Sequence, residues 1–268
     1  MKRVHAALLA LSLVSVIAGC SSQQPLSQKQ NPPAKNEPVS NSATPATPTP
    51  APTQPAPVQP APQSKPATAT PKDLKVAANP TDVAVLVNKS IKLPDGYNPS
   101  DLVEPNVLFI FKEKDDRRLM RKEAATALES LFAGAKKEGL FLAGVSGYRS
   151  YVTQDSLFRY YVQTQGEETA RKYSAEPGHS EHQTGLAMDV SGSTGKCAAD
   201  DCFAGTPEAE WLAKHVAEYG FVIRYPKGKE QITGYAYEPW HLRYVGTKIA
   251  KEVMAKGITL EEYFKMAG

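Results

Sequence analysis

Apolar residues recur at helical spacing along several stretches of the chain between residues 80 and 268. The longest stretch covers residues 117–137 and is followed by Gly139, so we expect an amphipathic helix there. A second helix is predicted over residues 151–165, because Ser150 is a suitable N-cap and one side of the segment is apolar. Further helices are predicted over residues 168–173, 207–219, 245–256 and 260–266.

Short apolar runs between these helices predict strands, which are expected over residues 107–111, 140–145, 185–190 and 221–225. Residues 228–237 have the composition of a hairpin or loop. Strands and helices are mixed without a regular strand–helix–strand repeat. The pattern therefore predicts an α+β fold, with a small antiparallel sheet and flanking helices around a single site.

The first 20 residues have the features of an export signal. Lys2 and Arg3 precede an apolar run over residues 6–18, which is shorter than the roughly 20 residues of a membrane span. Residues 17–20 resemble the lipobox of bacterial lipoproteins, which implies that Cys20 becomes the lipidated first residue. The alternative is an ordinary secretory signal with an incidental cysteine. We expect an exported protein whose lipid anchors it to the cell membrane, with its folded domain on the cell-wall side.

Residues 21–79 are rich in Pro, Ala and Thr, and many of the 22 prolines fall between residues 32 and 71. Such a segment buries too little apolar surface to fold, so we expect a disordered and partly polyproline II tether. A proline-rich ligand for a binding module is the alternative. Residues 80–268 then form one domain. The formal net charge of +3 is too small to indicate a nucleic acid partner, and we expect a monomer.

Two separated segments carry the residues of a hydrolytic metal site. His182 and Asp189 lie in the first, and Glu238 and His241 in the second. Two imidazoles and one carboxylate can hold a zinc ion with an open position, and a second carboxylate can act as base. A lone histidine is usually structural, and we assign no catalytic role to His179 or His215. We predict that the strand carrying Asp189 lies next to residues 238–241.

The segments SGYRSYVTQ, PGHSEHQTGLAMDV and GYAYEPWHLRYVG resemble those of VanY-type D-alanyl-D-alanine carboxypeptidases. This zinc peptidase family also contains L,D-carboxypeptidases that trim peptidoglycan stem peptides. The resemblance implies that His182, Asp189 and His241 bind one zinc ion and that Glu238 is the catalytic base. The resemblance covers roughly residues 88–263.

Arg149 in the first of these segments is expected to be an active-site residue, as the resemblance implies. A planar guanidinium suits either the terminal carboxylate of a substrate or a developing oxyanion. We also expect substrate contacts from Gln154, Ser180 and Tyr225. The alternative for these three residues is a structural role on a helix surface, in a turn or in packing.

Cys197 and Cys202 are the cysteines that remain once Cys20 is lipidated. An exported protein meets an oxidising environment, so we expect a disulfide between them. A cysteine metal site or a catalytic thiol is less favoured, because no suitable partner accompanies either residue.

The sequence thus predicts a zinc-dependent D-alanyl-D-alanine carboxypeptidase that removes the terminal D-alanine of stem peptides. An L,D-carboxypeptidase acting on the tetrapeptide is the alternative with the same chemistry. A non-catalytic cell-wall-binding lipoprotein is the alternative from another class, and loss of Glu238 or a ligand would be its signature. None of these residues is lost.

Overall fold

The computed structural model describes residues 75–265. The predictions for the signal peptide over residues 1–20, for Cys20 and for most of the linker lie outside this part. The described chain begins inside the segment predicted as linker. There β1 (Lys75–Val76) pairs in parallel with β2 (Ile91–Lys92), so the fold includes residues before the predicted boundary at residue 80.

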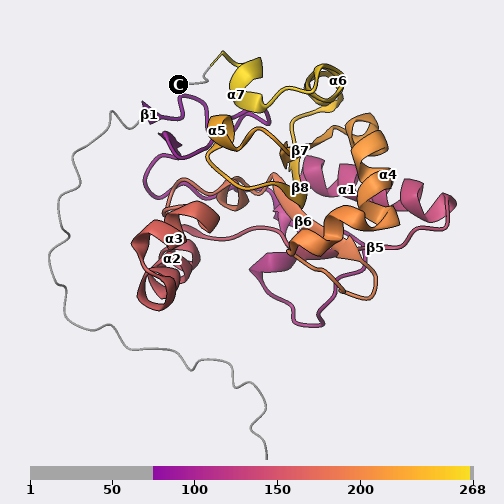
Figure 1. The fold of residues 1–268 in the computed structure, drawn as a ribbon, viewed down its shortest axis with the longest axis horizontal. Coiled ribbons are helices and arrows are strands. Elements are labelled where there is room, and N and C mark those ends of the chain that lie inside the picture. Colours follow the sequence, from indigo (N-terminus) through magenta and orange to yellow (C-terminus); the bar gives the residue numbers. More distant parts are fainter. Residues whose placement is uncertain (1–74, 266–268) are drawn as a thin grey trace, which may run out of the picture. The chain divides into compact units, whose positions relative to one another are not determined.

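A four-stranded antiparallel sheet occupies the centre of the fold (Figure 1). Its strands follow the order β5-β6-β8-β7. Their bounds are Leu142–Ser146 for β5, Ala187–Gly192 for β6, Phe221–Tyr225 for β7 and Glu238–Tyr244 for β8. Together with the surrounding helices, this sheet confirms the α+β prediction. A separate two-stranded sheet pairs β3 (Leu102–Val103) with β4 (Met120–Arg121).

The two faces of this sheet have different environments. Met188 and Leu242 are register partners and belong to the hydrophobic core. The next pair, Asp189 and His241, lies on the opposite face because side chains alternate along a strand. The predicted contact between the strand of Asp189 and residues 238–241 is therefore confirmed.

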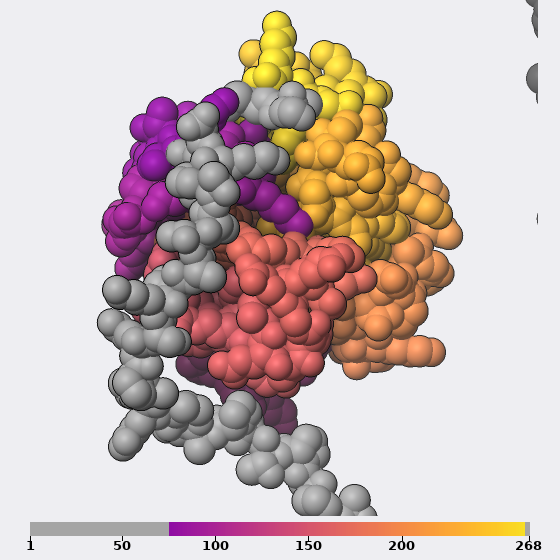
Figure 2. Space-filling view, turned by 60° about the vertical axis from the view of Figure 1, so that its left-hand side comes forward, coloured from indigo at the N-terminus to yellow at the C-terminus, as the bar shows by residue number. Residues whose placement is uncertain are grey.

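Helices cover the core face of the sheet. Helix α1 contacts β5, α4 contacts β6 and β8, and α6 contacts β7. By contrast, α2 and α3 pack mainly against each other and lie apart from α1 and α4 (Figure 1). In Figure 2 the segment that carries them is at the surface, between the start of the described chain and its C-terminal half.

The α-helices span Lys122–Lys137 (α1), Tyr151–Gln165 (α2), Glu167–Tyr173 (α3), Pro207–His215 (α4), Glu230–Thr233 (α5), Thr247–Lys256 (α6) and Leu260–Tyr263 (α7). Short 3-10 helices span Asp116–Arg118 (η1), Glu181–Thr184 (η2), Asp201–Gly205 (η3) and Val216–Tyr219 (η4).

Several predicted elements have ends that differ from the structure by a few residues, and three predictions differ more clearly. The helix predicted from residue 117 begins at Lys122, because Met120 and Arg121 pair with β3 instead. The strand predicted over residues 107–111 is wrong, since Phe109 forms only an isolated bridge to Gly144. The predicted loop over residues 228–237 contains the single helical turn α5. None of the helices in residues 75–265 has the length and apolar composition needed to span a membrane.

Candidate metal and catalytic site

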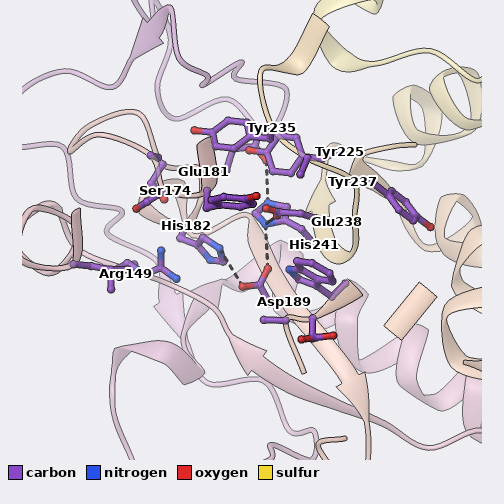
Figure 3. Close-up of a pocket in the computed structure, with 18 of the residues that line it drawn as sticks. Arg149, Ser174, Glu181, His182, Asp189, Tyr225, Tyr235, Tyr237, Glu238 and His241 are labelled. Atoms are coloured by element: carbon purple, nitrogen blue, oxygen red, sulfur yellow. Dashed lines mark ion pairs between the residues drawn. The ribbon is translucent and has the colours of Figure 1, made fainter. Parts of the chain in front are cut away.

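His182, Asp189 and His241 meet in one buried cluster (Figure 3). Asp189 Oδ2 lies 3.4 Å from His182 Nε2, and Asp189 Oδ1 lies 3.0 Å from His241 Nδ1. The two imidazole rings meet edge to face, with 5.0 Å between their centroids. One ligand atom from each residue lies within 4.8 Å of the others, so a single ion could contact all three.

Local structure aims each ligand at this point. The register of β6 and β8 sets Asp189 beside His241. His182 lies in η2, and its Nδ1 is 2.7 Å from the backbone carbonyl oxygen of Gly147. Because this carbonyl can only accept, Nδ1 carries the proton and the lone pair of Nε2 faces the cluster.

The donor set fits a zinc ion. Asp189 Oδ1 is buried and makes no hydrogen bond with any residue of the described chain. Burial lowers the pKa of His182 to about 3, so this imidazole is neutral, as a metal ligand must be. Burial opposes the charge on Asp189, but His182, His241 and Arg149 outweigh it and lower the pKa of the carboxyl. Two imidazoles and one carboxylate form a common zinc site with an open position.

Glu238 lies next to the cluster at the start of β8, with its Oε2 3.7 Å from His241 Nδ1. A spacing of three residues would put Glu238 and His241 on opposite faces of a regular strand. The register of β7 and β8 shifts between Ile223 and Tyr225, where Tyr225 pairs with Glu238, and this irregularity turns Glu238 toward the site. Burial raises the pKa of Glu238 to about 7, a suitable value for a base at neutral pH.

Arg149 lines the same cavity, whose volume is about 490 Å³. In Figure 3 it lies on the side opposite Tyr237, with the metal-ligand cluster between them. Its Nη1 donates to Gln154 Oε1 at 3.0 Å and its Nη2 donates to Ser146 Oγ at 3.1 Å. Burial lowers the pKa of the guanidinium, and the charges of Asp189 and Glu238 partly offset this effect. Arg149 is thus a fixed positive charge at the edge of the cluster.

The three predicted substrate-binding residues have different positions. Ser180 and Tyr225 line the cavity, and the Tyr225 ring lies 4.9 Å from the His241 ring. Gln154 is completely buried behind Arg149, and its Nε2 donates to the carbonyl oxygen of Ala175 at 2.7 Å. Gln154 therefore holds Arg149 in place, which is the structural role that the sequence analysis gave as the alternative to a substrate contact.

The other two histidines of residues 75–265 lie outside the metal-ligand cluster, and the two cysteines in this part of the chain are paired. His179 Nδ1 lies 2.7 Å from the carbonyl oxygen of Asn88, away from the cluster. His215 stacks on Trp211 at the surface. Cys197 and Cys202 form the expected disulfide. It closes the loop over residues 197–202, and positions 199–201 within this loop line the cavity.

Sequence reasoning missed a buried charge network beneath the cluster. Glu181 Oε1 accepts hydrogen bonds from Arg224 Nε and Arg243 Nη1, both at 2.7 Å. Arg224 also binds both carboxylate oxygens of Glu261 in α7, at 2.6 and 3.0 Å. All four side chains are almost completely buried. The available signal was an arginine within each of the apolar strands β7 and β8, because a charge buried in a strand requires a partner.

Comparison with known proteins shows the family to which the chain belongs. The family model for VanY, described as D-alanyl-D-alanine carboxypeptidase, matches residues 117–247. The chain is 52% identical over 192 residues to a Bacillus subtilis protein that is named as the carboxypeptidase YodJ. The aligned residues cover 72% of this chain and 70% of YodJ. The chain belongs to the VanY family of carboxypeptidases. It is therefore a peptidase of the carboxypeptidase type.

Solved structures extend the comparison. The LdcB LD-carboxypeptidase matches with a TM-score of 0.70 and 50% identity, over 75% of this chain and 94% of that chain. A mutant of the D,D-pentapeptidase VanY, in complex with Zn(II), matches with a TM-score of 0.55 and 30% identity, over 68% of this chain and 98% of that chain. The fold of this family member is thus shared with carboxypeptidases of both specificities.

Proposed function

We propose that this family member is a zinc-dependent carboxypeptidase that removes the terminal D-alanine from peptidoglycan stem peptides. The observation that supports it most directly is the convergence of His182, Asp189 and His241 on one point, with Glu238 beside them. A non-catalytic wall-binding protein would not need a buried carboxylate whose pKa is raised to about 7.

The residues of the site suit the two proton transfers of peptide hydrolysis. His182, Asp189 and His241 would hold the zinc ion, which would supply Lewis acidity toward water and the peptide carbonyl. Glu238 accepts a proton from the attacking water and returns it to the departing amine. Arg149 offers a guanidinium to the substrate carboxylate or to the developing oxyanion, and Gln154 and Ser146 keep it in position.

We further propose that the specificity is that of an L,D-carboxypeptidase acting on the tetrapeptide. The support is the 50% identity to LdcB over nearly all of that chain, against 30% to the D,D-pentapeptidase VanY. The D,D-carboxypeptidase that the motifs first indicated is the second candidate, and the VanY family match supports it.

Two defined substrates distinguish these specificities. Purified protein loaded with zinc is incubated with a stem tetrapeptide, whose last D-alanine follows an L-centre, or with a pentapeptide ending in D-Ala-D-Ala. We expect D-alanine to be released from the tetrapeptide much faster. Release from the pentapeptide alone would establish the D,D type, and release from neither would overturn the carboxypeptidase proposal. Glu238→Gln is the control for contaminating peptidases.

We also propose that the chain is exported and lipid-anchored through Cys20, with the residues between Cys20 and β1 as a tether. The support is the sequence pattern, since a basic start and a short apolar run lead to Gly19 and Cys20. Metabolic labelling with a fatty acid tests it. We expect label in the wild-type protein and none in Cys20→Ser, and equal label in both would contradict the assignment.

A further inference from the structure

The two nitrogens of His241 face two different carboxylates. Nδ1 faces the metal-ligand cluster, 3.0 Å from Asp189 Oδ1. Nε2 faces the other way and lies 3.4 Å from Glu181 Oε2. Within residues 75–265, neither Nε2 nor this Oε2 has a hydrogen-bond partner. The Glu181 side chain is 0% exposed, and that of His241 is 5% exposed, so water does not readily replace the missing partners.

Glu181 is held in this place by its other oxygen. Arg224 and Arg243 both donate to Oε1, which leaves Oε2 for His241. Arg243 is fixed in turn, because its Nη2 donates to the carbonyl oxygen of Val85 at 2.6 Å. Arg224 is fixed by its two hydrogen bonds to Glu261. The carboxylate next to His241 therefore has little freedom to turn away.

A fixed carboxylate beside Nε2 selects one form of the imidazole. The proton of a neutral His241 is favoured on Nε2, where it can point to Glu181, and the lone pair then lies on Nδ1, facing Asp189. We propose that Glu181 is a positioning residue that sets the tautomer and orientation of His241 for metal binding. This inference deepens the proposed function and rests on its zinc site.

Glu261 provides a matched control for Glu181. Both are buried carboxylates bound to Arg224, but only Glu181 faces His241. Glu181→Gln and Glu261→Gln each remove one negative charge from the same network, so both should lower the melting temperature of the metal-free protein. Because Glu261→Gln leaves the Glu181 carboxylate and its hydrogen bond from Arg243 in place, zinc binding should weaken much more in Glu181→Gln if the positioning role is correct.

The decisive measurement is zinc affinity, by competition with a chelating indicator, on the folded full chain. We expect Glu181→Gln to weaken zinc binding about 10- to 100-fold, and Glu261→Gln to weaken it far less. Wild-type affinity in Glu181→Gln, or equal weakening in both variants, would overturn the inference while leaving the zinc enzyme intact. Absence of zinc binding by the wild type would overturn the proposed function as well.

A measurement on the wild type covers the case in which Glu181→Gln does not fold. Long-range ¹H–¹⁵N spectra of the zinc-loaded protein report which nitrogen of His241 carries the proton. We expect a proton on Nε2 that exchanges slowly with solvent. A proton on Nδ1, or an Nε2 proton in rapid exchange, would contradict the inference.

Discussion

Glu238 destabilises the metal-free fold at neutral pH, and Glu238→Gln should remove that penalty. Burial raises its pKa from 4.5 to about 7, with further contributions from the charges of Asp189 and Glu181. Between these two values the folded chain binds more protons at this group than the unfolded chain does. Stability contributed by this group therefore falls as pH rises through that window, and the full penalty is present above about pH 7.

The size of the effect follows from the shift. One pKa unit corresponds to 1.36 kcal/mol, so the ionised carboxylate destabilises the metal-free fold by about 3 kcal/mol. Its side chain is only 17% exposed, so solvent screens little of this. Glutamine has a similar shape and does not ionise. We expect Glu238→Gln to be more stable than wild type by about 3 kcal/mol at pH 8, or roughly 6–12 °C in melting temperature, and nearly equal at pH 4.

Thermal unfolding in the presence of a chelator at pH 4, 6 and 8 tests this prediction. The exposed residue Glu138 provides the matched control, because Glu138→Gln should follow the wild-type curve. With zinc present, Glu238→Gln should also lose about 10²- to 10⁴-fold in the rate of D-alanine release. Parallel stability curves for wild type and Glu238→Gln would refute the reasoning about the buried base.

Three further predictions concern residues that line or support the cavity. Arg149→Gln should lower kcat/KM about 10²- to 10³-fold with unchanged zinc content, and normal turnover would remove Arg149 from the active site. Gly147→Ala should lower both the melting temperature and the zinc affinity. The new Cβ would lie 2.5 Å from the Leu119 carbonyl oxygen, which would displace the Gly147 carbonyl that holds His182. Wild-type zinc affinity in a less stable variant would contradict this role of the Gly147 carbonyl. Cys197→Ser should cost about 2 kcal/mol in urea unfolding, the loop-closure contribution of so short a loop. Reduced wild type should match this variant, and a difference between them would contradict the loop-closure argument.

Local signals predicted those elements that the chain determines locally. Ser150 caps α2 by accepting from the backbone N–H of Thr153, and the helix has the predicted bounds. Thr259 and Glu262 form a capping box at the start of α7, as a threonine followed three residues later by glutamate indicates. Strand β7 also has its predicted bounds.

Tertiary pairing decided the elements that were mispredicted. Met120 has helical spacing with α1, yet it is completely buried in β4, because β3 offers a strand partner. Residues 107–111 form an apolar run, but their pairing with the sheet is limited to one bridge between Phe109 and Gly144, made by backbone hydrogen bonds of Leu108 and Ile110 to Gly144. The pairing partner is invisible to a local pattern.

In the site, too, some features follow from the local sequence and others depend on tertiary packing. Residue types and spacing singled out His182, Asp189, Glu238 and His241, and the structure brings these four side chains together. The pattern could not place Gln154 behind Arg149, because the direction of a side chain depends on how α2 packs. Nor could it predict the Glu181 network, whose members come from four separate elements.

The most direct test of the account is metal content measured together with peptide cleavage on the full chain. We predict one zinc ion per chain, loss of D-alanine release when a chelator removes it, and recovery when zinc is restored. Undiminished release by chelator-treated, zinc-free protein would contradict the central claim that this carboxypeptidase depends on zinc held by His182, Asp189 and His241.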